Sequence, residues 1–189
     1  MRWLKKVLGQ TGRKAAEERC TKGYIAAREG RLDDAQRLYD DAVDADPTLA
    51  VAAFNAGQTA LERYNRDVAS LDAAARTQRL RTALQHLEKA LVIDDTHAPS
   101  WRAVARVQER LGDVVAAYDS WGRVERRLTP APAVDEPGQT VAREPTREQQ
   151  EERAQARNER LRLKPAADLA RAMATVQDLV GEAIVDPTA

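Results

Sequence analysis

The chain has 189 residues, of which 32% are charged, 43% are hydrophobic and only 4% are aromatic. Its 30 lysines and arginines balance its 30 aspartates and glutamates, which argues against a dedicated nucleic-acid binder, because such proteins carry a strong basic excess. The single cysteine, Cys20, excludes an internal disulfide, and the lack of any apolar run of about 18 residues excludes a membrane-spanning helix. A core of Ala, Leu and Val predicts close-packed helices, and we expect a soluble cytoplasmic protein. The Ala- and Arg-rich composition is typical of a bacterium with a GC-rich genome.

Residues 1–15 form a basic amphipathic segment. Four apolar residues share one face of a short predicted helix, and three basic residues take the other: Trp3, Leu4, Val7 and Leu8 against Arg2, Lys5 and Lys6. Such a segment either covers the first helices of the main domain or docks weakly on an anionic membrane surface.

The stretch EGRLDDAQRLYDDAVDADPTLA, residues 29–50, has a pattern that recurs twice. It places Ala35, Tyr39 and Ala42 at steps of four and three, after a turn glycine at position 30. The matching residues are Ala83, Leu87 and Ala90, then Ala117, Trp121 and Val124, with Gly112 at the last turn. The second interval is 34 residues, the period of a repeated antiparallel helix pair, and the first is 48, the same period with 14 residues inserted.

These residues resemble the tetratricopeptide repeat family over residues 16–129. The units are 16–49, 50–97 and 98–129, and each first helix carries a small residue at the same offset: Gly23, Gly57 and Ala105. Small residues let the two helices of a pair approach closely, while larger ones fill the space between pairs. The resemblance implies an all-α fold, a solenoid of three antiparallel helix pairs. The alternative is an Ala-rich helical bundle without repeats.

The inserted residues lie between Gly57 and Ala83. They contain no Gly or Pro, so they predict that both helices of the second pair are lengthened by about two turns into a spur. One face of the spur is apolar: Leu61, Tyr64, Val68 and Leu71. These residues either close the spur on itself or form a second contact surface.

Three segments follow the repeats. Residues 130–145 read as a Pro-rich linker, and residues 146–164 as a charged helix or a disordered segment, opened by a capping box of Thr146 and Gln149. Residues 165–186 predict an amphipathic tail helix that begins at Pro165. Its apolar stripe consists of Leu169, Met173, Val176, Val180 and Ile184. The stripe can cap the solenoid, occupy the chain's own groove, or pair with another chain, including a second copy.

No constellation of residues suggests catalysis. Asp94, Asp95 and His97 are the one metal candidate, but a solvated turn with Thr96 capping the next helix explains them better. His86 lies in a repeat helix without a catalytic partner. We therefore expect no enzymatic activity, no cofactor and no metal.

The tetratricopeptide resemblance implies a groove lined by the first helix of each pair, which holds peptides or helices. The positions in this chain are Tyr24, Arg28, Phe54, Asn55, Gln58, Arg102 and Arg106. Asn55 and Gln58 can hydrogen-bond a peptide backbone, and Arg102 and Arg106 can grip a carboxylate. If the groove is instead filled by the chain's own tail, these are solvated side chains.

We therefore predict an adaptor or scaffold that binds a partner peptide or helix in the groove, with the tail helix as a second contact or as an occluder. One alternative is a structural subunit held in an assembly by its tail and spur. The other is a peripheral membrane protein that uses residues 1–8.

One branch of the family can be examined residue by residue. Domains that hold the acidic tails of heat-shock chaperones use a clamp of lysines and asparagines. Asn55 matches the central asparagine, but Cys20 and Tyr24 replace the lysine and asparagine of the first helix, and Pro99 replaces a lysine of the third. In addition, Arg102 is one residue off the clamp's basic position. We do not expect chaperone-tail binding.

Overall fold

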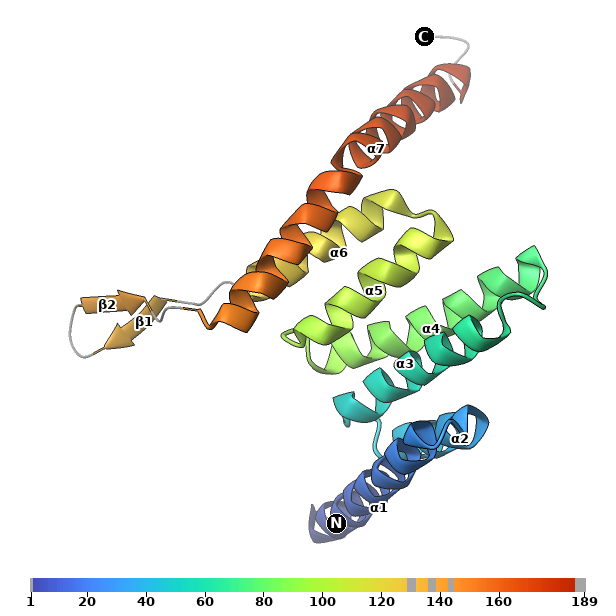
Figure 1. Ribbon diagram of the computed structural model, residues 1–189, viewed down its shortest axis with the longest axis vertical. Helices are drawn as coiled ribbons and strands as arrows, with labels where there is room; N and C mark the ends of the chain where they lie inside the picture. The colour runs from blue at the N-terminus through green and yellow to red at the C-terminus, as the bar shows by residue number, and fades with distance from the viewer. Residues whose placement is uncertain (1, 129–131, 136–138, 143–144, 186–189) are drawn as a thin grey trace. The chain divides into compact units, whose positions relative to one another are not determined.

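The structure is a computed structural model that describes residues 2–128, 132–135, 139–142 and 145–185, with side chains described for residues 11–128 and 145–177. The helices (Figure 1) are α1 Arg2–Arg28, α2 Leu32–Ala45, α3 Ala50–Asp67, α4 Ala73–Ile93, α5 Ala98–Leu111, α6 Val114–Arg127 and α7 Arg147–Val185. The all-α class predicted from the sequence is confirmed. A short antiparallel hairpin, β1 Pro132–Asp135 and β2 Gln139–Ala142, lies where the linker was predicted.

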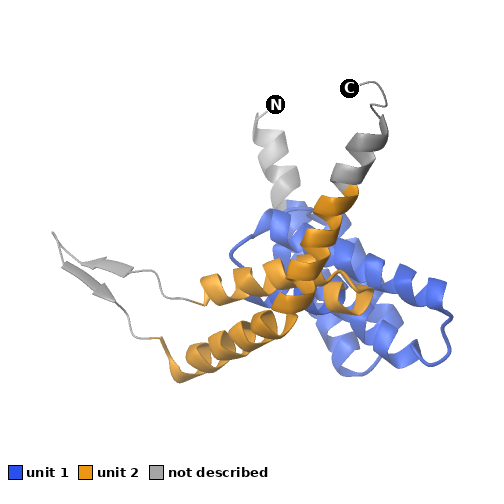
Figure 2. Cartoon of the chain, turned by 90° about the horizontal axis from the view of Figure 1, so that it is seen from above, with its two compact units in different colours: residues 1–107 blue, residues 108–189 orange. Residues whose placement is uncertain are grey.

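The chain divides into two compact units (Figure 2), Met1–Val107 and Gln108–Ala189, which we call unit 1 and unit 2. Unit 1 contains α1 to α4 and most of α5. Unit 2 contains the last turn of α5, the helices α6 and α7, and the hairpin. No helix in the described part of the chain has the length and apolar character needed to cross a membrane.

In unit 1, α1 packs against α2, α3 packs against α4, and α2 packs against α3, so the two pairs are stacked. The core at this junction is dominated by alanines, together with four larger residues: Cys20, Tyr39, Val43 and Leu49. The two glycines predicted at close helix contacts are where the packing needs them. A Cβ at Gly23 would lie 2.9 Å from Tyr39 Cε1, and one at Gly57 would lie 2.6 Å from Leu87 Cγ.

The turns repeat in detail. Gly30 and Gly112 have φ of +76° and +80°, in the left-handed region that favours glycine. Between the first and second units of the repeat, Thr48 donates to Asp46 Oδ1 from its backbone N (3.0 Å) and from Oγ1 (2.6 Å). Thr96 makes the same two bonds to Asp94, at 3.0 and 2.6 Å. Thr96 is thus an Asx-turn donor rather than the helix cap we expected, and the turn survives without the proline of the first unit.

The insertion is distributed unevenly. Helix α3 has 18 residues and α4 has 21, compared with 14 in each of α2, α5 and α6. The predicted two turns are present in α4, but α3 gains only about one. The reason is a defined turn: Ser70 donates from N and Oγ to Asp67 O, and Asp72 caps α4 by accepting from Ala75 N at 2.7 Å. The apolar face of the spur turns inward, since Leu61 is buried and the other three members are half-buried.

In unit 2, α7 packs against α6. The buried residues of α7 are Ala156, Leu163 and Ala167. The capping box is confirmed, because Thr146 N donates to Gln149 Oε1 (3.0 Å) and Gln149 N donates to Thr146 Oγ1 (3.2 Å).

Two boundaries differ from the prediction. Helix α1 is continuous from Arg2, so the N-terminal segment is part of the first repeat helix. Helix α7 runs through Pro165 instead of beginning there. Pro165 is exposed, on the side of α7 away from the buried residues, so the carbonyl left without its amide partner faces solvent.

Candidate functional site

A cavity of about 240 Å³ lies in unit 1, and we call it the α1–α3 cavity. It is lined by Tyr24, Ala27 and Arg28 of α1, Tyr39 of α2, and Phe54, Asn55, Gln58, Thr59 and Glu62 of α3. Five of the seven residues predicted from the sequence are therefore brought together in one place. The first helices of two successive repeats supply the walls, because helical spacing repeats each wall residue after one turn.

The walls and the base of this cavity differ in character. Tyr24 is 58% exposed, and Phe54, Asn55 and Gln58 are half-buried. Tyr39 and Thr59 are only 2% and 3% exposed. The sequence analysis treated Tyr39 as a packing residue and overlooked Thr59. The signal available was the hydroxyl itself, since a residue that only packs needs no polar atom.

Charges are confined to the rim. Arg28 and Glu62 are exposed, and neither forms an ion pair within residues 11–128. At the base, burial raises the pKa of Tyr39 to about 12, with smaller contributions from Cys20, Glu62 and Tyr24. The Tyr39 hydroxyl therefore keeps its proton at neutral pH and can donate a hydrogen bond.

One wall is held in place by a neighbouring loop. The ring of Phe54 meets the ring of His97 edge-on, with centroids 4.8 Å apart, and His97 Nδ1 lies 2.7 Å from Ser100 Oγ. His97 is thus engaged in packing. In the part of the chain with described side chains, no three His, Cys, Asp or Glu residues are grouped to hold a metal ion.

The other two predicted groove residues lie elsewhere. Arg102 and Arg106 are on α5, half-buried and exposed respectively, and neither lines the α1–α3 cavity. Their proposed grip on a carboxylate stays a prediction. Cys20, at a clamp position, is buried, and burial raises the pKa of its thiol.

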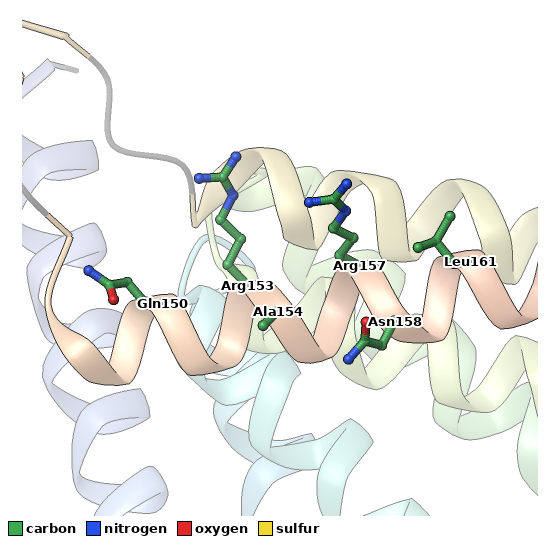
Figure 3. A pocket seen from close by; sticks show the side chains of 6 residues that line it. All are labelled: Gln150, Arg153, Ala154, Arg157, Asn158 and Leu161. Carbon is green, nitrogen blue, oxygen red and sulfur yellow. The ribbon is translucent and has the colours of Figure 1, made fainter.

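A second cavity, of about 480 Å³, runs along one side of α7 (Figure 3). It is lined by Gln150, Arg153, Ala154, Arg157, Asn158 and Leu161. Arg153 and Arg157 are one turn apart and make no ion pair among the described residues, whereas Arg147, Arg160, Arg162 and Arg171 of the same helix are all paired. The sequence gave no sign of it, because this segment is polar on every face.

The apolar stripe of the tail is open to solvent where it is described. Leu169, Met173 and Val176 are 63%, 56% and 58% exposed. Helix α7 packs on α6 through its other face, so within unit 2 these three residues are not buried. Val180 and Ile184 belong to α7, but their side chains lie outside the described ones, as do those of residues 1–8.

Solved structures share this arrangement of helices. PcrH in complex with the chaperone-binding region of PopD matches with a TM-score of 0.58 at 14% identity, over 79% of this chain and 91% of that one. The first TPR domain of Spaghetti, bound to the HSP90 peptide SRMEEVD, matches with 0.56 at 18% identity, over 82% and 94%. The chain has the tetratricopeptide-repeat fold.

The TPR domain of Arabidopsis OM64 matches equally well, with a TM-score of 0.56 at 17% identity, over 82% of this chain and 98% of that one. No family model and no curated protein matches the sequence. In the tetratricopeptide-repeat fold, α1 and α3 are the first helices of successive repeats. The α1–α3 cavity therefore lies on the face formed by first helices, where the sequence placed the groove.

Proposed function

We propose that the protein is a non-catalytic, cytoplasmic adaptor or scaffold that binds a peptide segment or helix of a partner protein at the α1–α3 cavity. The observation that carries this proposal is the convergence of Tyr24, Arg28, Phe54, Asn55 and Gln58 on one cavity. Aromatic walls supply contact area, and the side-chain amides supply both hydrogen-bond donors and acceptors for a backbone.

The structural neighbours support this use of the fold. The Spaghetti domain holds an HSP90 peptide and PcrH holds a region of PopD. The chaperone-type clamp is incomplete in this chain, so we propose a different peptide sequence for its partner.

The proposal is tested by selecting peptides from a random displayed library with the full chain as bait. Selected peptides are expected to shift the backbone amides of α1 and α3 in NMR spectra and to lose affinity in Asn55→Ala and Gln58→Ala. A matched control is Gln155→Ala, an exposed residue of α7. Peptides that bind equally to the wild type and to both cavity variants would place the binding function elsewhere.

A second candidate, a structural subunit held by its tail, is favoured by the exposure of Leu169, Met173 and Val176. A double change of Leu169→Asp and Met173→Asp should then abolish incorporation into the assembly, or self-association seen by sedimentation velocity. The cavity variants should leave both unchanged. The reverse pattern would favour the adaptor.

A further inference from the structure

The base of the α1–α3 cavity holds two deeply buried hydroxyls that have no hydrogen-bond partner in the chain. Tyr39 is 2% exposed and Thr59 is 3% exposed, and neither side-chain oxygen is bonded to any described residue. Buried polar groups in folded proteins are nearly always paired, so two unpaired ones in one place need an explanation.

Thr59 differs from the other threonines inside helices. The hydroxyls of Thr21, Thr77, Thr82 and Thr175 each donate to the carbonyl four residues earlier, at 3.0 to 3.1 Å. The Thr59 hydroxyl makes no such bond, although it sits in the middle of α3. Its oxygen therefore keeps its full hydrogen-bonding capacity.

Both oxygens open on the cavity. The unpartnered polar atoms that are fully enclosed in the described part of unit 1 are Gln36 Oε1 and Arg63 Nε, and the two hydroxyls are not among them. They line the cavity together with the amides of Asn55 and Gln58, which also make no hydrogen bond with a described residue. The base thus presents four uncharged polar groups with unused donors and acceptors.

We propose that the α1–α3 cavity is an anchor pocket for one uncharged amide side chain, glutamine or asparagine, of the partner segment. This inference rests on the proposed function and specifies the chemistry of its ligand. An amide oxygen accepts from the Tyr39 and Thr59 hydroxyls, and the amide NH₂ donates to the side-chain oxygens of Asn55 and Gln58.

Size and charge select an amide over other groups. The volume of about 240 Å³ is below the range of sites for whole small molecules and suits one side chain. A carboxylate or ammonium at the base would lose its hydration without an ion partner, because Arg28 and Glu62 lie at the exposed rim. An apolar side chain would leave the two hydroxyls unpaired.

The test uses the ¹⁵N-labelled full chain and three probes of equal length: the N-acetyl, N-methylamide derivatives of glutamine, glutamate and methionine. Each is titrated while the side-chain signals of Asn55 and Gln58 and the amide of Thr59 are followed. We expect the glutamine probe to bind about fivefold more tightly than the other two, the effect of one or two net hydrogen bonds. Tyr39→Phe and Thr59→Val should remove this preference and leave methionine binding unchanged.

Both variants delete an oxygen without an internal partner, so the melting temperature should not fall, and a folded variant is available for each comparison. Tighter binding of glutamate or methionine, or a glutamine preference that persists in both variants, would overturn the proposal. So would an absence of shifts at these three residues. If selected peptides bind at the cavity but contain no required Gln or Asn, the anchor chemistry fails while the adaptor function stands.

Discussion

The ring of Tyr39 lies flat against Gly23, where a Cβ would be 2.9 Å from Cε1 and 3.1 Å from both Cδ1 and Cζ. The same tyrosine lines the α1–α3 cavity on its other side. The glycine of α1 therefore determines how far the tyrosine of α2 stands from the cavity. Packing and the candidate site share one side chain.

We predict that Gly23→Ala lowers the free energy of unfolding by about 1–2 kcal/mol, because overpacking outweighs the helix propensity gained. The displaced ring should also narrow the cavity and weaken peptide binding. Urea unfolding followed by circular dichroism measures the first effect. Gly122→Ala is the control: its nearest neighbours are at 3.5 Å, so stability should be unchanged or slightly raised. Equal destabilisation at both sites would contradict the close-contact explanation.

Two leucines of α7 separate its docking face from its free face. Leu163 is 6% exposed and Leu169 is 63% exposed. Leu163→Ala should cost about 2–3 kcal/mol of unfolding free energy, and Leu169→Ala less than about 0.5 kcal/mol. Hydrogen exchange of the α7 amides reports the same contrast locally. A large effect of Leu169→Ala on the isolated chain would mean that its stripe is buried in solution.

The repeat pattern was sufficient to predict the order and class of the helices. Gly23, Gly57, Tyr39 and Leu87 interact between elements close in sequence, and their spacing is imposed by helix geometry. The starts of α3 at Ala50 and α5 at Ala98 follow the same period. Local chemistry was also legible in the capping box of Thr146.

What the sequence did not show depends on three-dimensional convergence. Five cavity residues could be placed on two helices, but Tyr39 joins them from a third, through the packing of α2 on both. Pro165 predicted a helix start, because local propensity cannot register the anchoring of the preceding turns of α7 on α6. The length of α3 was set by the turn at Ser70 and Asp72, whose bonds close only when both helices are in place.

The tip of the spur is held by a charge cluster with a defined pH dependence. Asp67 accepts hydrogen bonds from Arg66 (2.8 Å) and Arg79 (2.7 Å), which lower its pKa from 3.8 to about 2. The folded pKa is depressed, so the stabilisation is present above the ordinary value of 3.8 and is lost as pH falls toward 2. The stability difference between wild type and Asp67→Asn should shrink across that window.

NMR titration of the Asp67 carboxyl checks this prediction directly. Arg79→Gln should move its midpoint upward toward the ordinary value, because one of the two charged donors is removed. Arg147→Gln, which removes an exposed pair with Glu151, serves as the control and should leave Asp67 unaffected. A midpoint near 3.8 in the wild type would show that the tip cluster does not form in solution.

Pro165 gives a last prediction, on the stability of α7. It removes one amide donor inside the helix, and it is tolerated because it is exposed, opposite the face formed by Ala156, Leu163 and Ala167. Pro165→Ala should therefore raise the free energy of unfolding by up to about 3 kcal/mol and slow hydrogen exchange in the turns on either side. Gln155→Ala, also exposed on α7, should change stability by less than about 0.5 kcal/mol. Faster exchange after Pro165→Ala would indicate instead that the proline marks a real break, with a separate tail helix beginning there.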